Sequence, residues 1–254
     1  MGVLTGKTAL VTGGSRGIGR GIARKLAREG ARVAIHYGHS EEAARETVEL
    51  IRLDGGQAFE TRAELGVPGD VTELYAGLDA GFARQGWGPE FDILVNNAGV
   101  SGSARIDEVT PELYEQIFAV NTRSLVFLVQ QGLKRMRDGG RIINISSAAT
   151  RIAFPESVVY AMSKGAVNTF TLALAKELGG RGITVNAVEP GFVETEMNAA
   201  RRAAPEHAAE LASWSAFDRL GQPSDIADVV AFLASDAGRW VTGQCIDASG
   251  GSKL

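Results

Sequence analysis

Short apolar runs alternate with amphipathic stretches along nearly the whole chain. The first run, residues 8–12, is rich in β-branched side chains and predicts a strand. The next stretch, residues 17–29, has apolar residues at helical spacing, Ile18, Ile22 and Leu26, and predicts a helix. Further strands are predicted at 32–37, 58–64, 92–96, 141–146, 183–188 and 244–248, and further helices at 41–53, 71–84, 111–136 and 159–178. This alternation is typical of right-handed βαβ crossovers. It predicts an α/β fold with a doubly wound, seven-stranded parallel sheet and helices on both faces.

Two segments interrupt the alternation. Residues 99–110 form a stretch of small residues after a strand, and residues 191–218 form a long, charged, Ala-rich stretch after another. Long loops in compact α/β domains are usually binding loops or lids, because ligands bind at the carboxyl ends of the strands. We expect a substrate lid at about 191–218, with a solvated surface loop as the alternative. No change in composition marks a linker, so residues 1–254 are interpreted as a single dinucleotide-binding and catalytic domain.

Charge and composition narrow the class of partner. With 26 basic and 30 acidic side chains, the net charge of −4 offers no broad positive surface for nucleic acid or an anionic membrane. The longest apolar run, residues 125–129, is far short of the ~20 residues of a membrane-spanning helix. A single cysteine cannot close an intrachain disulfide, which favours a reducing, cytoplasmic location. We therefore expect a small-molecule partner. The last three residues, Ser252, Lys253 and Leu254, match a peroxisomal address and leave that location as the alternative in a eukaryote.

A glycine-rich turn lies between the first strand and the first helix. It reads TGGSRGIG over residues 12–19. Gly13 permits a tight turn, Gly17 allows the backbone to approach a pyrophosphate, and Gly19 allows close packing of helix on strand. The helix that follows presents unpaired N–H groups to an anion. The turn therefore predicts a dinucleotide site.

The end of the second strand indicates which nicotinamide cofactor binds. A carboxylate is usual there when the ribose 2′-hydroxyl is free, but this chain has His36, Tyr37 and Gly38. Arg16 can pair with a 2′-phosphate, and Ser40 can donate a hydrogen bond to it. The sequence therefore predicts NADP(H) in preference to NAD(H).

Tyr160 and Lys164 stand four residues apart on a predicted helix, which places them on one face. A lysine ammonium ~4 Å from a tyrosine hydroxyl contributes ~4 kcal/mol at an effective dielectric of ~20, or about three pKa units. This spacing predicts a tyrosine whose pKa is lowered toward neutrality. Ser147 lies at the end of a strand, where α/β folds place groups that face ligands.

These motifs, together with Asn96-Asn97-Ala98-Gly99 and Asn121, resemble those of the short-chain dehydrogenase/reductase family over nearly the whole chain. The chain is similar to the branches that contain acyl-carrier-protein ketoreductases and polyhydroxynaphthalene reductases. The resemblance implies a Rossmann fold in which Ser147 binds the substrate carbonyl and Tyr160 is the general acid/base. It also implies that Lys164 holds the nicotinamide ribose and lowers the pKa of Tyr160, and that Asn121 supports a proton relay.

The resemblance further implies which residues contact the cofactor. They are Gly13, Ser15, Arg16, Gly17, Ile18, Gly19, Tyr37, Ser40, Glu64, Leu65, Asn97, Ala98, Gly99, Tyr160, Lys164, Pro190, Gly191, Val193 and Thr195. Two positions depart from the family pattern. Glu64 replaces the common aspartate at the adenine, and Asp138 stands where carrier-protein ketoreductases have a basic residue, although Arg181 fits another such position. A homotetramer, or a homodimer, is implied in the same way.

The function predicted is an NADPH-dependent ketoreductase that transfers hydride between NADP(H) and a carbonyl or secondary alcohol. An NAD-dependent alcohol or sugar dehydrogenase of the same family is the nearer alternative. A nucleotide-sensing binding protein is the alternative from another class. The three histidines are not at metal-ligand spacing, so no metal site is predicted.

Overall fold

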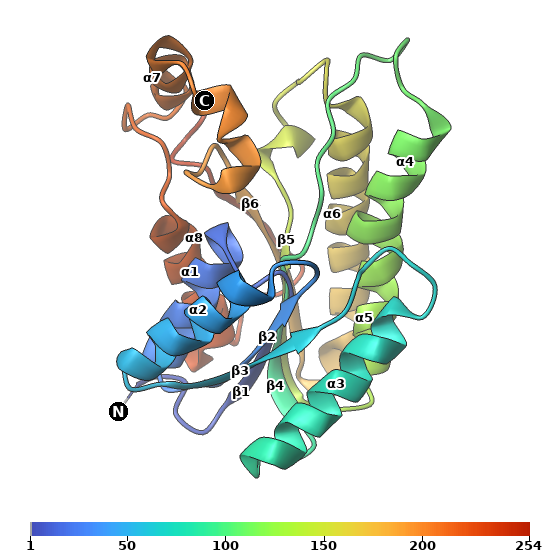
Figure 1. Cartoon of the computed structure of the whole chain (residues 1–254), viewed down its shortest axis with the longest axis vertical. Helices are drawn as coiled ribbons and strands as arrows, with labels where there is room; N and C mark the ends of the chain where they lie inside the picture. The colour runs from blue at the N-terminus through green and yellow to red at the C-terminus, as the bar shows by residue number, and fades with distance from the viewer. Residues whose placement is uncertain (1) are drawn as a thin grey trace.

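All seven strands of the sheet run parallel, in the order β3-β2-β1-β4-β5-β6-β7 (Figure 1). The structure is a computed structural model and describes residues 2–254. The strands are β1 (Thr8–Val11), β2 (Arg32–Tyr37), β3 (Gln57–Arg62), β4 (Phe91–Asn96), β5 (Met136–Ile145), β6 (Thr184–Pro190) and β7 (Cys245–Ala248). The α-helices are α1 (Gly17–Arg28), α2 (Glu41–Leu53), α3 (Asp70–Gln85), α4 (Pro111–Phe118), α5 (Leu125–Gly132), α6 (Val158–Leu178), α7 (Pro205–Ser213) and α8 (Pro223–Ala234). The predicted fold class is confirmed.

Helices cover both faces of the sheet, so the central strands are apolar on both sides. In β1, Ala9 and Val11 pack into one core with residues of α1 and α8, whereas Leu10 packs into the other core with residues of α3, α5 and α6. Figure 1 shows α1, α2 and α8 on one side of the sheet and α3 to α6 on the other. This arrangement explains why the strands read as short apolar runs and the helices as amphipathic ones.

The predicted helix over 111–136 is wrong at its C-terminal end and is not continuous. It consists of α4, a π-helical segment η1 (Ala119–Ser124) and α5, which ends at Gly132. Met136 already belongs to β5 and pairs with Phe91 of β4. Met136 is buried as a strand residue, just as it would be on the inner face of a helix. The apolar periodicity therefore continues across the turn after Gly132, and the sequence pattern does not show where the helix ends. The other predicted elements agree with the structure to within two residues, except that β5 begins five residues before the predicted strand.

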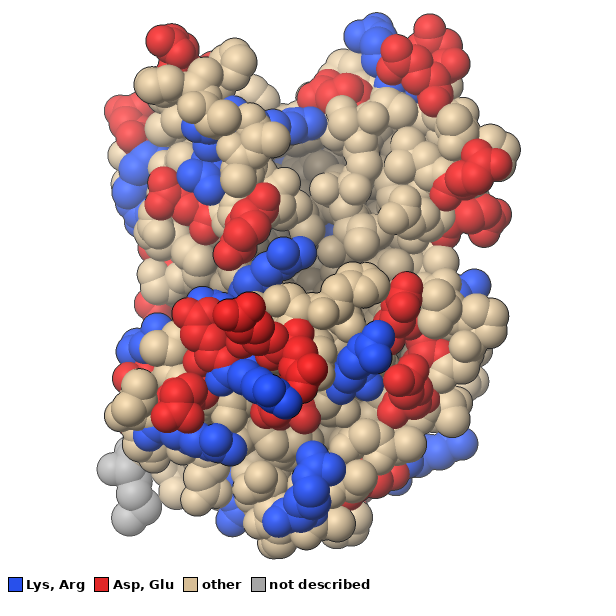
Figure 2. All heavy atoms as spheres, in the orientation of Figure 1, with Lys and Arg blue, Asp and Glu red and all other residues tan. Residues whose placement is uncertain are grey.

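The long segment after β6 forms a cover above the carboxyl ends of the strands. It contains two short 3-10 turns, η4 (Glu196–Asn198) and η5 (Ala200–Arg202), followed by α7. Figure 2 shows a hollow between this side of the molecule and the side that carries α4, with basic and acidic side chains mixed around it. Within residues 2–254, no helix combines the length and apolar character needed to cross a membrane.

Candidate active site

The turn between β1 and α1 is held in place by the end of β4. The Thr12 hydroxyl accepts hydrogen bonds from the backbone N–H groups of Asn97 (3.0 Å) and Ala98 (3.1 Å). The Asn97 side chain in turn donates to the carbonyls of Thr12 (2.9 Å) and Gly13 (3.0 Å). Two predicted cofactor segments, far apart in the sequence, therefore meet where the strand order reverses, which is where dinucleotides bind in such sheets.

The glycines of this turn make room for a pyrophosphate. Gly13 and Gly17 have φ values of +62° and +52°, which favour glycine. A Cβ at Gly19 would lie 2.1 Å from the Gly13 carbonyl oxygen, so only glycine fits there. Arg16, at the start of α1, makes no side-chain cap, and the first N–H groups of the helix stay available to an anion. Ser15 is buried beneath the turn, and Ile18 packs against the core. These residues fit a dinucleotide.

His36 is a residue of this site that the sequence analysis did not identify. Its Nδ1 accepts a hydrogen bond from the Gly13 N–H (3.1 Å), so Nε2 carries the proton and donates to the Ala63 carbonyl (2.9 Å). Burial lowers the pKa of His36 to about 4, although the bond to Ala63 acts in the opposite direction. His36 therefore stays neutral at physiological pH and ties the turn to β2 and β3. The sequence offered one indication of this role, namely that His36 lies near the end of a predicted strand.

The predicted adenosine end is open. Arg16 is exposed and forms no ion pair with any residue in the range 2–254. Tyr37 is buried, and Ser40 caps α2 by accepting a hydrogen bond from the Ala43 N–H (3.4 Å). Glu64 is exposed and Leu65 is half-buried, just beyond β3. A free guanidinium and the absence of a carboxylate directly after β2 are what a 2′-phosphate requires.

Ser147, Tyr160 and Lys164 come together beyond the ends of β5 and β4. The Lys164 ammonium donates to the Ile145 carbonyl (2.8 Å) and lies 5.8 Å from the centre of the Tyr160 ring. A Cβ at Gly99 would lie 3.5 Å from Lys164 Nζ, so Gly99 borders the same space. The Ser147 oxygen accepts the Ala149 N–H (3.1 Å), and because a hydroxyl both accepts and donates, Ser147 can still donate its own proton.

The expected lowering of the Tyr160 pKa is not found. Burial raises the pKa of Tyr160, and only its hydrogen bond with Ser147 acts in the opposite direction. Burial also lowers the pKa of Lys164 to about 8. The sequence analysis placed the Lys164 ammonium beside the Tyr160 hydroxyl. In the structure, this ammonium donates its hydrogen bond to the Ile145 carbonyl. Tyr160 is consequently protonated at neutral pH, as a proton donor must be.

Asn121 connects the loop after β4 to α6, the helix that carries Tyr160 and Lys164. Its side chain accepts the Val100 N–H (2.9 Å) and donates to the Val100 carbonyl (2.9 Å). It also donates to the Ser163 hydroxyl (3.0 Å), which in turn donates to the carbonyl of Tyr160 (2.7 Å). Asn121 lies in η1, and the π-helical distortion places this buried amide opposite α6.

The segment after β6 closes the other side of the site. Thr195 lies against the glycine-rich turn, since a Cβ at Gly17 would be 3.2 Å from its methyl group. Val193 is buried and forms an isolated bridge with Gly221. Gly191, which follows Pro190, is close enough to Ser249 that a Cβ there would lie 2.9 Å away. Of the four residues predicted on the nicotinamide side, Pro190 ends β6, and Gly191, Val193 and Thr195 follow it in this segment.

Three aromatic rings form a cluster between the loop after Ser147 and the end of α7. Phe154 stacks on Trp214 with ring centres 5.6 Å apart, and Phe192 meets both rings edge-on at 5.9 and 5.5 Å. Phe192 directly follows Gly191, so the cluster adjoins the predicted nicotinamide side. The sequence analysis named the segment 191–218, which carries Phe192 and Trp214, but not this cluster, because only the fold brings the three rings together.

The C-terminal tail packs against Trp214 of the segment after β6 and against Arg151. Ser252 is buried, and its carbonyl accepts a hydrogen bond from Arg151 (2.8 Å). The Lys253 ammonium lies 4.2 Å from the centre of the Trp214 ring, and its backbone N–H donates to the Trp214 carbonyl (2.9 Å). Ser252 and Lys253 are therefore held against the rest of the chain, whereas Leu254 is exposed.

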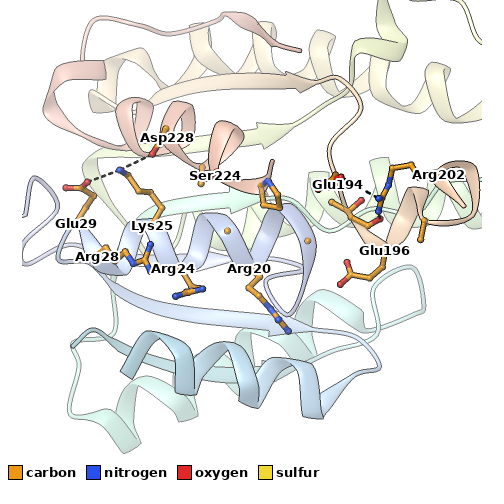
Figure 3. Close-up of a pocket in the computed structure, with 16 residues that line it drawn as sticks. Arg20, Arg24, Lys25, Arg28, Glu29, Glu194, Glu196, Arg202, Ser224 and Asp228 are labelled. Carbon is orange, nitrogen blue, oxygen red and sulfur yellow. Dashed lines mark hydrogen bonds and ion pairs between the residues drawn. The ribbon is translucent and has the colours of Figure 1, made fainter. Parts of the chain in front are cut away.

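A second hollow, of about 800 Å³, lies between α1, α8 and residues 194–202 (Figure 3). Some of its charges pair with one another: Lys25 with Glu29 (3.2 Å) and Asp228 (2.9 Å), and Arg202 with Glu194 (3.9 Å). Ser147, Tyr160 and Lys164, the predicted catalytic residues, do not line this hollow.

Comparison with known proteins places these features in context. Residues 13–253 match the family model described as enoyl-(acyl carrier protein) reductase. The chain is 40% identical to the versicolorin reductase of Emericella nidulans over 260 residues, covering 98% of this chain and 96% of that protein. It is 37% identical to the tetrahydroxynaphthalene reductase of Pyricularia oryzae over 263 residues, covering 98% and 90% respectively.

The structure is also similar to that of the angucycline C-6 ketoreductase LanV with bound NADP. The TM-score is 0.96 at 52% sequence identity, covering 100% of this chain and 98% of that one. A second LanV structure, which holds NADP and rabelomycin, has a TM-score of 0.92 at 50% identity, with the same coverage.

Proposed function

The chain belongs to the short-chain dehydrogenase/reductase family and is an NADP(H)-dependent ketoreductase; we propose that it reduces a ketone carried on a planar aromatic ring system. The reductase reaction is supported by one observation: Ser147, Tyr160 and Lys164 lie close together beside the glycine-rich turn. The observation that favours the substrate class is the aromatic cluster of Phe154, Phe192 and Trp214 next to them.

In this proposal each catalytic side chain has one role. NADPH, when bound, supplies the hydride. Negative charge then develops on the substrate oxygen, where the Ser147 hydroxyl stabilises it by donating a hydrogen bond. Tyr160 is protonated at neutral pH and donates its proton to that oxygen. Lys164 holds the nicotinamide ribose, and Asn121 keeps the loop after β4 against α6.

Recognition of NADP(H) is proposed to begin at Arg16. Its exposed guanidinium can form charge-assisted hydrogen bonds with the 2′-phosphate, and the N-terminus of α1 can receive the pyrophosphate. Tyr37 and Ser40 border the same end, and Glu64 and Leu65 lie toward the adenine.

The relatives and the polar contacts of one arginine favour a free aromatic ketone over a carrier-bound acyl group. Arg181 is the basic residue expected to meet an acidic carrier protein. It is engaged with Asp138 (2.7 Å) and donates to the carbonyls of Leu133 (3.2 Å) and Met136 (2.6 Å). It therefore stabilises the turn before β5 and is not free to bind a carrier.

The test is a titration of the purified protein with NADPH and NADH, followed by nicotinamide oxidation with matched ketones. Rabelomycin and hydroxynaphthalene-derived ketones form one arm, and β-ketoacyl thioesters and aliphatic ketones form the other. We expect turnover with NADPH and at least tenfold higher kcat/KM for the aromatic arm, a difference of roughly 1.4 kcal/mol in transition-state binding. Equal or higher kcat/KM for the thioesters would reject the aromatic class, and the absence of NADPH binding would reject the reductase itself.

A further inference from the structure

Glu189 is a buried carboxylate in β6 that the proposed hydride and proton transfers do not use. Its side chain is 6% exposed, one residue before Pro190. Its Oε1 accepts two hydrogen bonds, from the Thr150 hydroxyl (2.5 Å) and from Nδ2 of Asn168 (2.8 Å). Both bonds converge on the same carboxylate oxygen, so this atom links two separate elements of the fold.

The two donors belong to the two halves of the catalytic site. Thr150 lies in the turn that begins at Ser147, and its hydroxyl and its N–H both contact the Ser147 carbonyl, at 3.0 and 3.2 Å. Asn168 lies one helical turn after Lys164 and two after Tyr160 on α6, and therefore on the same face of that helix. Through these donors, Glu189 connects the Ser147 turn with the helix that carries Tyr160 and Lys164.

The energetic cost of this arrangement indicates that it does more than fill the core. A carboxylate buried in a sheet loses its hydration, and an apolar side chain would avoid that cost. The second polar atom of the Asn168 amide, Oδ1, is also buried and finds no partner within residues 2–254. The Asn168 side chain is therefore oriented by its bond to Glu189.

We propose that Glu189 is a positioning residue for catalysis. By holding Thr150 and Asn168 on one oxygen, it sets the distance between the Ser147 hydroxyl and the Tyr160 hydroxyl. This inference rests on the proposed function, because it assumes that Ser147 and Tyr160 act together on one substrate oxygen. Displacement of a catalytic group by about 1 Å can reduce turnover about 100-fold, so a small shift of the Ser147 turn is sufficient to be measured.

A double-mutant cycle tests the assignment. Ser147→Ala is expected to lower kcat about 100-fold, as does loss of a hydrogen-bond donor to a developing oxyanion. Glu189→Ala is expected to lower kcat about 10- to 100-fold while Kd for NADPH changes by less than about threefold. If Glu189 acts through Ser147, the double variant falls no further than about threefold below Ser147→Ala. Losses that multiply would overturn the proposal.

Two further variants keep the test independent of folding. Glu189→Gln retains an oxygen that can accept both bonds and is expected to keep kcat within about threefold of wild type. Thr150→Val removes one donor and is expected to behave like Glu189→Ala in kcat. A loss in Glu189→Gln equal to that in Glu189→Ala, or an unchanged kcat in Thr150→Val, would overturn the proposal.

Asp92→Asn is the matched control. Asp92 is a similarly buried carboxylate that accepts hydrogen bonds from the Thr8 N–H (2.8 Å) and Arg137 (2.9 Å), near the amino end of β4. The Asp92→Asn variant is expected to have a lower Tm with kcat within about threefold of wild type, because Asp92 lies at the amino end of β4 and Ser147 follows the carboxyl end of β5. A comparable fall in kcat would overturn the proposal by showing that stability alone controls turnover. Turnover of an aromatic ketone by the wild-type enzyme is established first, so failure of the cycle is distinct from failure of the proposed function.

Discussion

The Lys164 ammonium lies 5.8 Å from the centre of the Tyr160 ring, while its hydrogen bond goes to the carbonyl of Ile145. The two side chains share a helix face, yet the lysine is not bonded to the tyrosine hydroxyl. We therefore expect their proposed roles to be separable by mutation, with Tyr160 acting in the proton transfer and Lys164 holding the cofactor ribose.

Tyr160→Phe is expected to lower kcat by about 10²- to 10⁴-fold, because it removes the proton donor, and to leave NADPH binding nearly unchanged. Lys164→Met is expected to weaken NADPH binding as well as turnover. Stopped-flow hydride transfer and fluorescence titration with NADPH measure the two effects. Retention of turnover in Tyr160→Phe would remove Tyr160 as the acid.

Arg16→Ala is expected to weaken NADPH binding about 10- to 100-fold and NADH binding much less, because a charge-assisted hydrogen bond contributes roughly 1.5–3 kcal/mol. Binding of both cofactors is measured by isothermal titration calorimetry. Arg84→Ala, at an exposed arginine in the last turn of α3, is the control. An equal loss for both cofactors would mean that Arg16 does not contact the 2′-phosphate.

Stability is expected to decrease as the pH falls from 6.5 toward 4, because His36 has its pKa lowered to about 4 in the fold. Above pH 6.5 the imidazole is neutral in both states, so its contribution to stability is fully present. Between pH 6.5 and 4 the unfolded chain binds a proton that the folded chain does not. The free energy of unfolding then falls by roughly 2 kcal/mol between pH 7 and pH 5.

Urea denaturation of the wild type and of His36→Gln at the two pH values measures this contribution. Glutamine can accept the Gly13 N–H and donate to Ala63 without titrating. The variant is therefore expected to lose less stability than the wild type on acidification. Identical pH dependence in both proteins would assign the effect to other groups.

Trp214→Ala is expected to raise KM for an aromatic ketone about tenfold or more, with a smaller effect on an aliphatic ketone. The ring stacks on Phe154, and an aromatic contact contributes roughly 0.5–1.5 kcal/mol beyond its buried area. Trp240, which is 94% exposed, supplies a control variant of the same size. Parallel changes in KM for both classes of ketone would argue against a ring-binding cluster.

We expect a homotetramer, with a homodimer as the alternative. The exposed apolar side chains Val126 and Phe127 of α5 and Met162 and Leu172 of α6 are consistent with helix faces covered by another subunit. Light scattering is expected to give four times the mass of one chain, and Phe127→Glu to reduce it. A monomer at micromolar concentration would reject the expectation.

The sequence by itself determined the features that depend on local spacing. The alternation of apolar runs and amphipathic stretches specifies parallel strands and covering helices, and the glycine-rich turn and the Tyr160–Lys164 spacing depend on residues within one or two turns of each other. Backbone sterics and helix periodicity are enough to predict such features from neighbours along the chain.

The tertiary structure decided the features that depend on which strands lie side by side. His36 meets Gly13 across 23 positions, and Thr150 meets Glu189 across 39, so no local pattern shows either contact. The direction of the Tyr160 pKa shift was also decided there, because burial raises this pKa and outweighs the opposing hydrogen bond with Ser147. A hydrogen-bond partner or a desolvated environment is a property of the packed chain, and it exists only once distant segments have been brought into contact.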